Sequence, residues 1–292
     1  MNGVIVLNKP ADCTSFNAVR EVSRLFEKEK AGHSGTLDPM ATGVLPVFLG
    51  RATKCIQYLP DTDKEYVADI KFGIKTDTGD KEGKTVFFSD DRPNVIDWDK
   101  SMKDHLGDQL QIPPMYSAIK KNGVPLYEIA RSGKTIDREP RQINISEIET
   151  LYFDGQTAKI RVKCSAGTYI RTLAENLAEQ CGCYAFLTAL KRTYACGFSI
   201  NETVTLERLE KSGNREQFVI TPEKMFTDYP SVELDDNLSR LFLNGFVFPI
   251  HRTGVQYDIG CRINVFNGSK YIGLGEITDA AELRKLWQTE VL

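Results

Sequence analysis

Two segments of the chain alternate between apolar and polar residues with the period of a half-exposed β-strand. In residues 65–73 and again in residues 158–164, every second position is apolar. Successive side chains of a strand point to opposite faces, so each segment has one face suited to a core. The apolar positions are Tyr66, Ala68, Ile70 and Phe72, then Ala158, Ile160, Val162 and Cys164. We expect two strands, with Tyr66 on the core-facing side of the first.

The first sixty residues show the patterns of two strands and two helices. A short apolar strand ends at Pro10, and Ser15 is suited to cap the helix that follows. The apolar positions of that helix recur at helical spacing and are Phe16, Val19, Val22 and Phe26. Residues 44–49 are typical of a buried strand, and residues 52–59 indicate a helix.

Further along, the pattern predicts two more helices and a turn. Residues 76–80 form the turn, residues 95–106 a helix, and a second helix follows residues 167–172. The buried face of this second helix is expected to contain Ala174, Leu177, Ala178 and Cys181.

The composition changes between residues 222 and 230, where turn-forming prolines bracket a charged stretch. Beyond it, residues 261–266 and 270–278 form an expected hairpin around Asn267-Gly268, a dipeptide that favours tight turns. We therefore expect a larger α+β domain at residues 1–228 and a small β-rich module at residues 229–292. The module is either a stabilising extension or an accessory domain.

Composition and charge narrow the classes of function. No apolar run among the 292 residues approaches the length of a membrane span, and the N-terminus lacks the features of a signal peptide. Seven scattered cysteines are best explained as reduced thiols, so a cytoplasmic protein is expected. Cys181 and Cys183 are spaced wrongly for a zinc knuckle, and no metal site is expected.

The net charge of −3 means that contact with a nucleic acid requires a local basic patch. Residues 113–145 contain six basic side chains against three acidic ones, together with Tyr116 and Tyr127. Cations suit phosphates and aromatic rings suit unstacked bases, so this segment fits loop RNA. It also fits an ordinary solvated loop with a helix, and the pattern alone does not choose between them.

Residues 32–46 form the most informative segment, because glycines and prolines surround a single carboxylate, Asp38. Such a loop can aim one side chain. An Asp-Pro pair also commonly caps a turn or a helix start, and that interpretation is open on the pattern alone.

The whole run resembles the nucleophile loop of the TruB family, the bacterial tRNA pseudouridine-55 synthases. Other segments resemble the same family. These are Lys64-Glu65-Tyr66, residues 167–171, Leu190-Lys191-Arg192, and residues 112–120, which look like the RNA-gripping thumb insertion of the family. The resemblance is strong over residues 2–198 and weak beyond them. It implies the pseudouridine-synthase fold for the catalytic domain, with a mixed, mostly antiparallel sheet, and a PUA-like, RNA-binding C-terminal module.

The resemblance also implies roles for individual residues. Asp38 would be the nucleophile and Arg171 its ion-pair partner; Tyr66 would stack on the flipped base, with Tyr169 close by. His33 would fill the gap that the uridine leaves, and the backbone around Leu190 would contact the uracil edge. The remaining expected substrate contacts are Asp80, Lys64, Lys9 and Lys120, the last within a thumb-like insertion at 113–145.

The implied function is isomerisation of the uridine at position 55, in the T-loop of tRNA, without a metal or redox cofactor. A carboxylate could attack either C1′ of the ribose or C6 of the uracil ring, and the sequence leaves both routes open. Two alternatives are a synthase acting on another RNA and a non-catalytic tRNA-folding protein on the same scaffold. We expect a monomer that uses tRNA as its partner and contacts neither a guide RNA nor a membrane.

Overall fold

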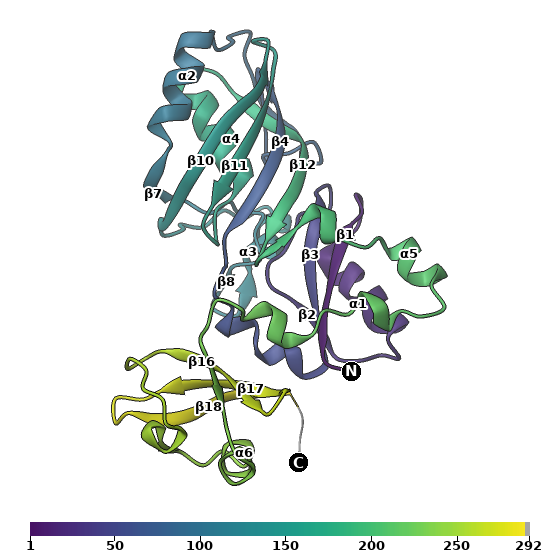
Figure 1. Ribbon diagram of the computed structural model, residues 1–292. Helices are drawn as coiled ribbons and strands as arrows, with labels where there is room; N and C mark the ends of the chain where they lie inside the picture. Colours follow the sequence, from purple (N-terminus) through teal and green to yellow (C-terminus); the bar gives the residue numbers. More distant parts are fainter. Residues whose placement is uncertain (290–292) are drawn as a thin grey trace.

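A mixed sheet of nine strands organises the first 199 residues in the computed structural model, which describes residues 1–289 (Figure 1). The main path of the sheet contains β1 (Gly3–Lys9), β3 (Thr42–Leu49), β12 (Ala185–Ala195), β4 (Lys64–Phe72), β11 (Thr157–Cys164), β10 (Arg141–Phe153) and β7 (Gly107–Gln111), in that spatial order. Two short strands, β2 (Ala31–His33) and β13 (Phe198–Ser199), pair with β3 and β12. The predicted mixed, mostly antiparallel sheet is confirmed.

One seam joins the two halves of this sheet. Every other neighbouring pair is antiparallel, whereas β12 and β3 are parallel and share only two residue pairs, Lys191 with Thr42 and Arg192 with Gly43. At this crossing Gly43 has φ +104°, and a Cβ there would lie 2.1 Å from the Arg192 carbonyl oxygen. The strands can approach this closely only because residue 43 has no side chain.

The alternating segments form β4 and β11, as predicted, and their apolar faces enter the core. Helices α2 (Val95–Asp104) and α4 (Ile170–Gln180) cover this part of the sheet, at the top of Figure 1. Trp98 of α2 packs against Phe72 and Phe153, and its indole N–H donates to Thr150 Oγ1 over 2.9 Å. The buried indole is thereby both packed and satisfied.

Helix α1 (Ser15–Leu25) begins one residue earlier than expected. The cap is Thr14, whose hydroxyl accepts from the Asn17 N–H over 3.1 Å, so the prediction that Ser15 is the cap was wrong. Phe16 is 72% exposed, and the predicted apolar face was therefore also wrong at that residue. One residue turns a helix by about 100°, which moves Ser15 into the core and Phe16 out of it.

The helix expected at residues 52–59 is instead two 3₁₀ turns, η1 (Gly50–Lys54) and η2 (Ile56–Tyr58). Cys55 lies between them, fully buried, with its thiol donating to the Ala52 carbonyl oxygen. The apolar side chains here pack toward the C-terminal module and not along one helical stripe, so helical spacing was misleading.

Several elements had no clear signal in the sequence, among them β7, β10 and β12. The smaller ones are β5 (Ile74–Thr76), β6 (Thr85–Phe88), β8 (Lys120–Lys121), β9 (Val124–Pro125), α3 (Leu126–Arg131), η3 (Ile200–Glu202), α5 (Leu206–Lys211), η4 (Glu216–Phe218) and η5 (Pro222–Met225). No helix among residues 1–289 is long and apolar enough to cross a membrane.

A separate five-stranded sheet follows and has its own apolar core. It contains β14 (Ser231–Glu233), β16 (Arg262–Asn267), β17 (Lys270–Ile277), β18 (Glu282–Gln288) and β15 (Phe248–Pro249), with α6 (Asp236–Leu243) and η6 (Ile250–Thr253). The expected hairpin is β16–β17. Its two-residue loop is Gly268-Ser269, one residue later than Asn267-Gly268, and Gly268 has φ +55°.

The C-terminal sheet packs against the N-terminal half of the large sheet through a shared apolar cluster. Tyr271 and Trp287 of the small sheet meet Val44 and Phe48 of β3 in this cluster. Asn264 is buried at the same junction, and its Nδ2 donates to the carbonyl oxygens of Phe226 (2.7 Å) and Tyr229 (3.0 Å). One amide group therefore fixes the chain that leads into the module.

We predict that Asn264→Ala lowers the free energy of unfolding by about 1–3 kcal/mol, because it removes two hydrogen bonds and leaves the partly buried Tyr229 carbonyl oxygen without its donor. Urea denaturation of the whole chain measures this loss. Asn201→Ala, at an exposed position, is the control and should change stability little. Equal stability of the two variants would contradict the role assigned to Asn264.

Candidate active site

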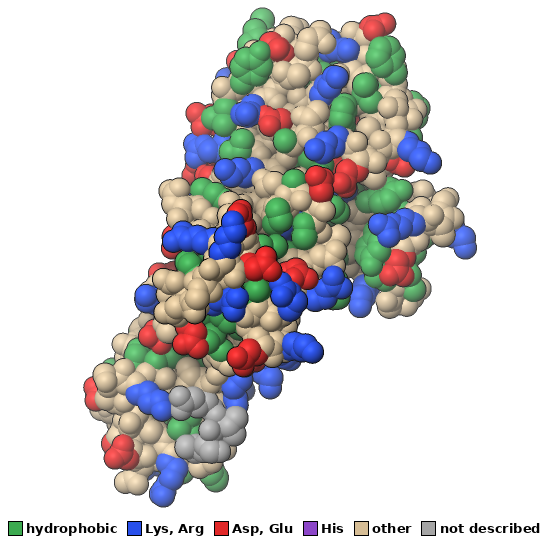
Figure 2. Space-filling model, turned by 90° about the vertical axis from the view of Figure 1, so that its right-hand side faces the viewer, with side chains coloured by type: hydrophobic (Ala, Val, Ile, Leu, Met, Phe, Trp, Pro, Cys, Tyr) green, Lys and Arg blue, Asp and Glu red, His purple; other side chains and the backbone are tan. Residues whose placement is uncertain are grey.

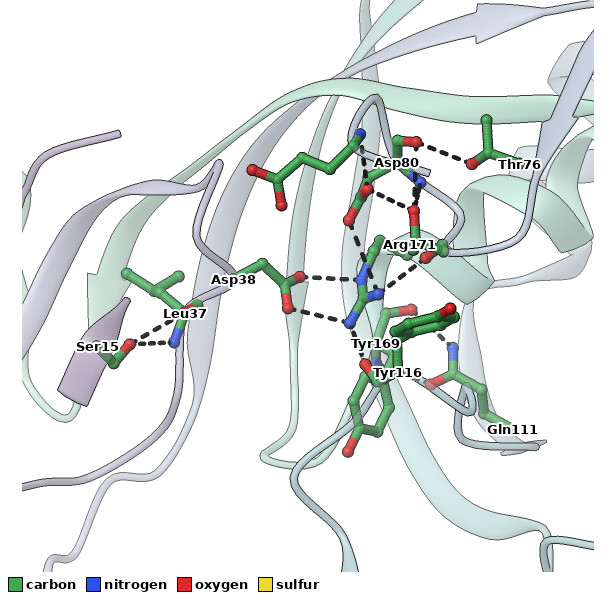
Figure 3. Close-up of polar contacts among 11 residues, drawn as sticks. Ser15, Leu37, Asp38, Thr76, Asp80, Gln111, Tyr116, Tyr169 and Arg171 are labelled. Carbon is green, nitrogen blue, oxygen red and sulfur yellow. Dashed lines mark hydrogen bonds and ion pairs between the residues drawn. The ribbon is translucent and has the colours of Figure 1, made fainter. Parts of the chain in front are cut away.

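Asp38 lies in the loop between β2 and β3, and its neighbours in the loop are fixed on both sides. Ser15 Oγ donates to the Leu37 carbonyl oxygen over 3.0 Å and accepts from the Leu37 N–H over 2.8 Å (Figure 3). The Ala41 N–H donates to the Asp38 carbonyl oxygen over 3.0 Å and closes a turn. The backbone around the carboxylate is therefore held without help from a ligand.

A buried lysine at the end of β1 supports the same loop. Lys9 is fully buried, and its ammonium group donates to the carbonyl oxygens of Pro10 (2.8 Å), Cys13 (2.5 Å) and Pro39 (3.1 Å). Burial lowers the pKa of Lys9. An ammonium group has three N–H donors, and all three are used here. The direct substrate contact expected of Lys9 does not fit this geometry, which gives it a positioning role.

Arg171, in the first turn of α4, holds the Asp38 carboxylate with two parallel contacts. Its Nε lies 2.9 Å from Asp38 Oδ2, and its Nη2 donates to Oδ1 over 3.0 Å. The remaining donors reach the carbonyl oxygens of Thr78 and Tyr116, each over 2.8 Å (Figure 3). Arg171 is only 5% exposed, so this guanidinium is fixed and shielded from water.

A second carboxylate approaches the same guanidinium. Asp80 Oδ2 lies 3.8 Å from Arg171 Nη1. Asp80 Oδ1 accepts from Thr78 Oγ1 over 2.6 Å and from the Glu82 N–H over 3.0 Å, while Thr76 Oγ1 donates to the Asp80 carbonyl oxygen over 2.8 Å. Arg171 therefore lies between two carboxylates, of which Asp38 is the more accessible, with a side chain 29% exposed against 4%.

The surroundings of Asp38 act on its pKa in opposite directions. Burial raises the pKa of the Asp38 carboxyl, Arg171 lowers it, and the negative charge of Asp80 raises it further, with a net upward shift. Asp38 is thus a more basic carboxylate than a solvated Asp, a property suited to a nucleophile.

We predict that Asp80→Asn lowers the pKa of Asp38, because the amide keeps the shape of the side chain and removes its charge. The carboxyl resonance of Asp38, followed by ¹³C NMR during a pH titration, should shift at a lower pH than in the wild type. Asp90→Asn removes an equal charge at an exposed loop position and is the control. An unchanged or raised Asp38 pKa in Asp80→Asn would contradict this assignment.

Tyr169 immediately precedes α4, and a buried glutamine fixes its backbone. Gln111 Oε1 accepts from the Tyr169 N–H over 2.8 Å, and Gln111 Nε2 donates to the Tyr169 carbonyl oxygen over 3.1 Å (Figure 3). Burial raises the pKa of the Tyr169 hydroxyl. Gln111, at the end of β7, therefore sets where the helix carrying Arg171 begins.

Tyr66 and Leu190 contribute the apolar part of the site from the adjacent strands β4 and β12. Each is 6% exposed. Burial raises the pKa of the Tyr66 hydroxyl, opposed by the positive charge of Arg192, its register partner on β12. The negative charge of Asp38 also raises the pKa of the Tyr66 hydroxyl, as the smallest of these effects.

Arg192 is a buried cation that holds both sides of the nucleophile loop. It is 1% exposed; its Nε donates to the Val44 carbonyl oxygen over 2.7 Å and its Nη2 to that of Gly35 over 3.2 Å. These two residues flank Asp38 in the sequence. Arg192 therefore holds the two ends of the loop at a fixed separation.

His33 and Lys64 lie near the positive charge of Arg192. The His33 Nδ1 accepts from the Gly35 N–H over 3.2 Å. Burial lowers the pKa of both His33 and Lys64, and the charge of Arg192 lowers both further. The imidazole is therefore neutral at pH 7, as a group that packs beside RNA bases should be.

Most of the predicted site residues lie around the Asp38 loop, and Lys120 lies away from it. Those that surround the Asp38 loop are Arg171, Tyr66, Tyr169, Asp80, Leu190, His33, Lys64 and Lys9. Lys120 is exposed on β8, in the small hairpin that precedes α3. The same 113–145 segment reaches the site through the Tyr116 backbone, which accepts from Arg171.

Sequence reasoning gave no role to Ser15 Oγ at Leu37, to Gln111 or to Arg192. Only Arg192 had a usable signal, because alternation along β12 places it on the same face as buried Leu190. Within residues 1–289, no three His, Cys, Asp or Glu side chains are grouped closely enough to hold a metal ion.

Comparison with protein families agrees with this geometry. Residues 23–170 match the model of the TruB family pseudouridylate synthase (N terminal domain). A tRNA pseudouridine synthase B of Pseudomonas fluorescens is 40% identical over 298 residues, which cover 99% of this chain and 97% of that protein. A protein of the same name from Saccharophagus degradans is 43% identical over 291 residues, covering 96% and 93%.

Among solved structures, the crystal structure of a Cbf5-Nop10-Gar1 complex contains a similar chain. The TM-score is 0.70 at 25% identity, and the match covers 99% of this chain and 84% of that one. The similarity therefore extends through the C-terminal sheet as well as the large one. Together with the family match and the full-length relatives, it leads to one conclusion: this chain belongs to the TruB family of pseudouridylate synthases.

Proposed function

We propose that this protein converts a uridine in the T-loop of tRNA, at position 55, to pseudouridine, with Asp38 as the nucleophile. The observation that carries the proposal is the Asp38 carboxylate, which lies within the matched residues 23–170 and is held by two contacts to buried Arg171. Full-length relatives named tRNA pseudouridine synthase B support tRNA as the substrate.

The reaction is an isomerisation, so its atoms and electrons balance within the nucleotide. The N1–C1′ bond breaks, the uracil turns over, and C5 bonds to C1′; the proton of C5 is lost and N1 gains one. The Asp38 carboxylate supplies the electron pair of a temporary covalent bond, to C1′ or to C6, and recovers it when that bond breaks. Both routes need an ionised and fixed carboxylate, which the pair with Arg171 provides.

A uridine within folded RNA must first leave its stack, at a cost of a few kcal/mol. The buried ring of Tyr66, whose register partner on β12 is Arg192, would stack on the flipped base and offset part of that cost. Neutral His33, at the edge of the site, is placed to occupy the vacated position in the RNA. The backbone at Leu190 then faces the uracil edge, with Tyr169 and Asp80 nearby.

The RNA-binding surface extends from this site in two directions. Residues 113–145 have exposed Lys120 and Lys121 for phosphates, and their backbone already contacts Arg171. Residues 229–292 provide a second surface. Recognition of a T-loop in particular rests on His33 and on the 113–145 segment. We further propose that the enzyme acts as a monomer on cytoplasmic tRNA and without a guide RNA.

We predict that Asp38→Asn reduces pseudouridine formation by at least about a thousandfold and leaves tRNA binding intact, because an amide keeps the shape but is no nucleophile. Pseudouridine mapping in tRNA from cells that lack the protein should show loss at the T-loop uridine. Wild-type protein should restore the modification, and Asp38→Asn should not. Rescue by Asp38→Asn would overturn the assignment of Asp38 as the nucleophile. A T-loop uridine that is still modified in cells lacking the protein would overturn the assignment of the substrate.

Arg171→Leu should lower kcat by about a hundredfold or more, since it removes the charge that orients Asp38 and leaves a carboxylate unpaired. Arg171→Lys keeps the charge but loses the planar fork, so its kcat should lie between those of Arg171→Leu and the wild type. Single-turnover kinetics with tRNA measure both. Equal kcat values for the Leu and Lys variants would show that charge at this position does not matter.

A further inference from the structure

A groove of about 530 Å³ lies where the C-terminal module meets η1 and η2. It falls within the usual size of ligand sites, and no part of the proposed chemistry uses it. One wall is formed by Arg51, Thr53, Lys54, Ile56 and Gln57, and the other by Lys285, Leu286, Trp287 and Gln288 of β18. Three of these lining residues are cationic and none is acidic.

The cations of the groove have no counter-ion among residues 1–289. Neither Arg51, Lys54 nor Lys285 forms an ion pair with a described carboxylate, although the chain has more acidic than basic residues. The Nε of Arg51 is buried without a hydrogen-bond partner. Burial and the adjacent charge of Arg51 lower the pKa of Lys285. Like charges held together in this way create a site that an anion would stabilise.

The rest of the groove holds these cations in place. The Arg51 backbone is fixed at both ends, because its N–H donates to Asn2 Oδ1 over 2.7 Å and its carbonyl oxygen accepts from the Trp287 indole over 2.9 Å. The Lys285 ammonium donates to the Leu243 carbonyl oxygen over 2.6 Å. The hydrogen bond between Trp287 and Arg51 therefore joins the β18 wall of the groove directly to the η1 wall.

The groove is also well separated from the reacting carboxylate. Strand β3 starts beside the Asp38 loop and ends at η1, and its eight residues span about 25 Å. Figure 2 shows Lys and Arg side chains beside the junction of the lower module with the body of the molecule. The RNA substrate of the proposed function is long and negatively charged, so its backbone can extend from Asp38 to the groove.

We propose that this groove binds a backbone phosphate of the RNA substrate, at a point remote from the reacting uridine. The cations of Arg51, Lys54 and Lys285 meet the phosphate, and apolar Ile56 and Leu286 lie against the adjoining sugar. The inference rests on the proposed function for the identity of the RNA. It assigns to the groove binding alone, with no part in bond breaking.

The test compares two groove variants with the wild type. One is the double variant Arg51→Gln/Lys54→Gln, and the other is the single variant Lys54→Glu. Lys54 is exposed, so the charge reversal does not endanger folding. Lys100→Glu, an exposed position on α2 at the opposite end of the molecule, is the matched control (Figure 1). The measurements are the Kd of unmodified tRNA over a series of salt concentrations, and kcat and KM for pseudouridine formation.

We expect the two groove variants to raise Kd and KM at least about fivefold with kcat unchanged within twofold. The slope of log Kd against log salt should also fall by about one for each phosphate that the variant no longer binds. Hydroxyl-radical footprinting should lose one protected patch away from the target loop. The Lys100→Glu control should match the wild type.

The proposal is overturned if the groove variants and Lys100→Glu bind tRNA equally, or if kcat falls while Kd stays constant. Saturable binding of inorganic phosphate or AMP at the groove, without any effect of the variants on tRNA, would also overturn it in favour of a small-anion site. If wild-type protein bound tRNA but formed no pseudouridine, the proposed function would fail, and the comparison of Kd values would still decide whether the groove holds RNA.

Discussion

One buried guanidinium joins three segments that are far apart in the sequence. Arg171 binds the Asp38 loop, the Thr78 carbonyl of the turn before Asp80, and the Tyr116 carbonyl of the 113–145 segment. A buried charge is costly unless every donor is satisfied, so all three segments must be in place for Arg171 to be stable where it is. The positions of Asp38 and of the 113–145 segment thus depend on the same side chain.

A second buried cation acts on the other side of the nucleophile loop, in a different way. Arg192 has no carboxylate partner among residues 1–289 and is held by the carbonyl groups of Val44 and Gly35. Lys9 is satisfied in the same manner from β1. Backbone carbonyls stabilise these cations without competing for Asp38, so the carboxylate keeps Arg171 as its own partner. Of the donors of these two cations, Arg192 Nη1 alone is buried without a hydrogen-bond partner in the described part of the chain. Bonds from Arg192 and Lys9 to backbone carbonyl groups therefore hold the Asp38 loop, and the charge of Arg171 holds the Asp38 carboxylate.

The parts of this structure that could be predicted are those set by local periodicity. The strands containing Tyr66 and Val162 follow from alternation, and the family resemblance identified the residues around Asp38. Ser15 shows where this fails, because a cap and a buried hydroxyl one residue later have the same local sequence signature. Gln111 could not be found at all, since its partner Tyr169 is distant in the chain and the bond is to the backbone. Lys9 was found but misassigned, because a sequence does not show that all three of its donors are already used.

The narrow seam between β12 and β3 has a mechanical consequence. Asp38 belongs to the half of the sheet that contains β1 and β3, whereas Arg171, Tyr66 and Tyr169 belong to the other half. These halves share two residue pairs in the sheet, and across this seam Arg192 of β12 donates to the carbonyl oxygens of Val44 and Gly35. A few contacts across one narrow seam thus determine both how the two halves of the sheet meet and how far Asp38 lies from Arg171. A substitution at Gly43 would therefore alter the site without touching any residue in it.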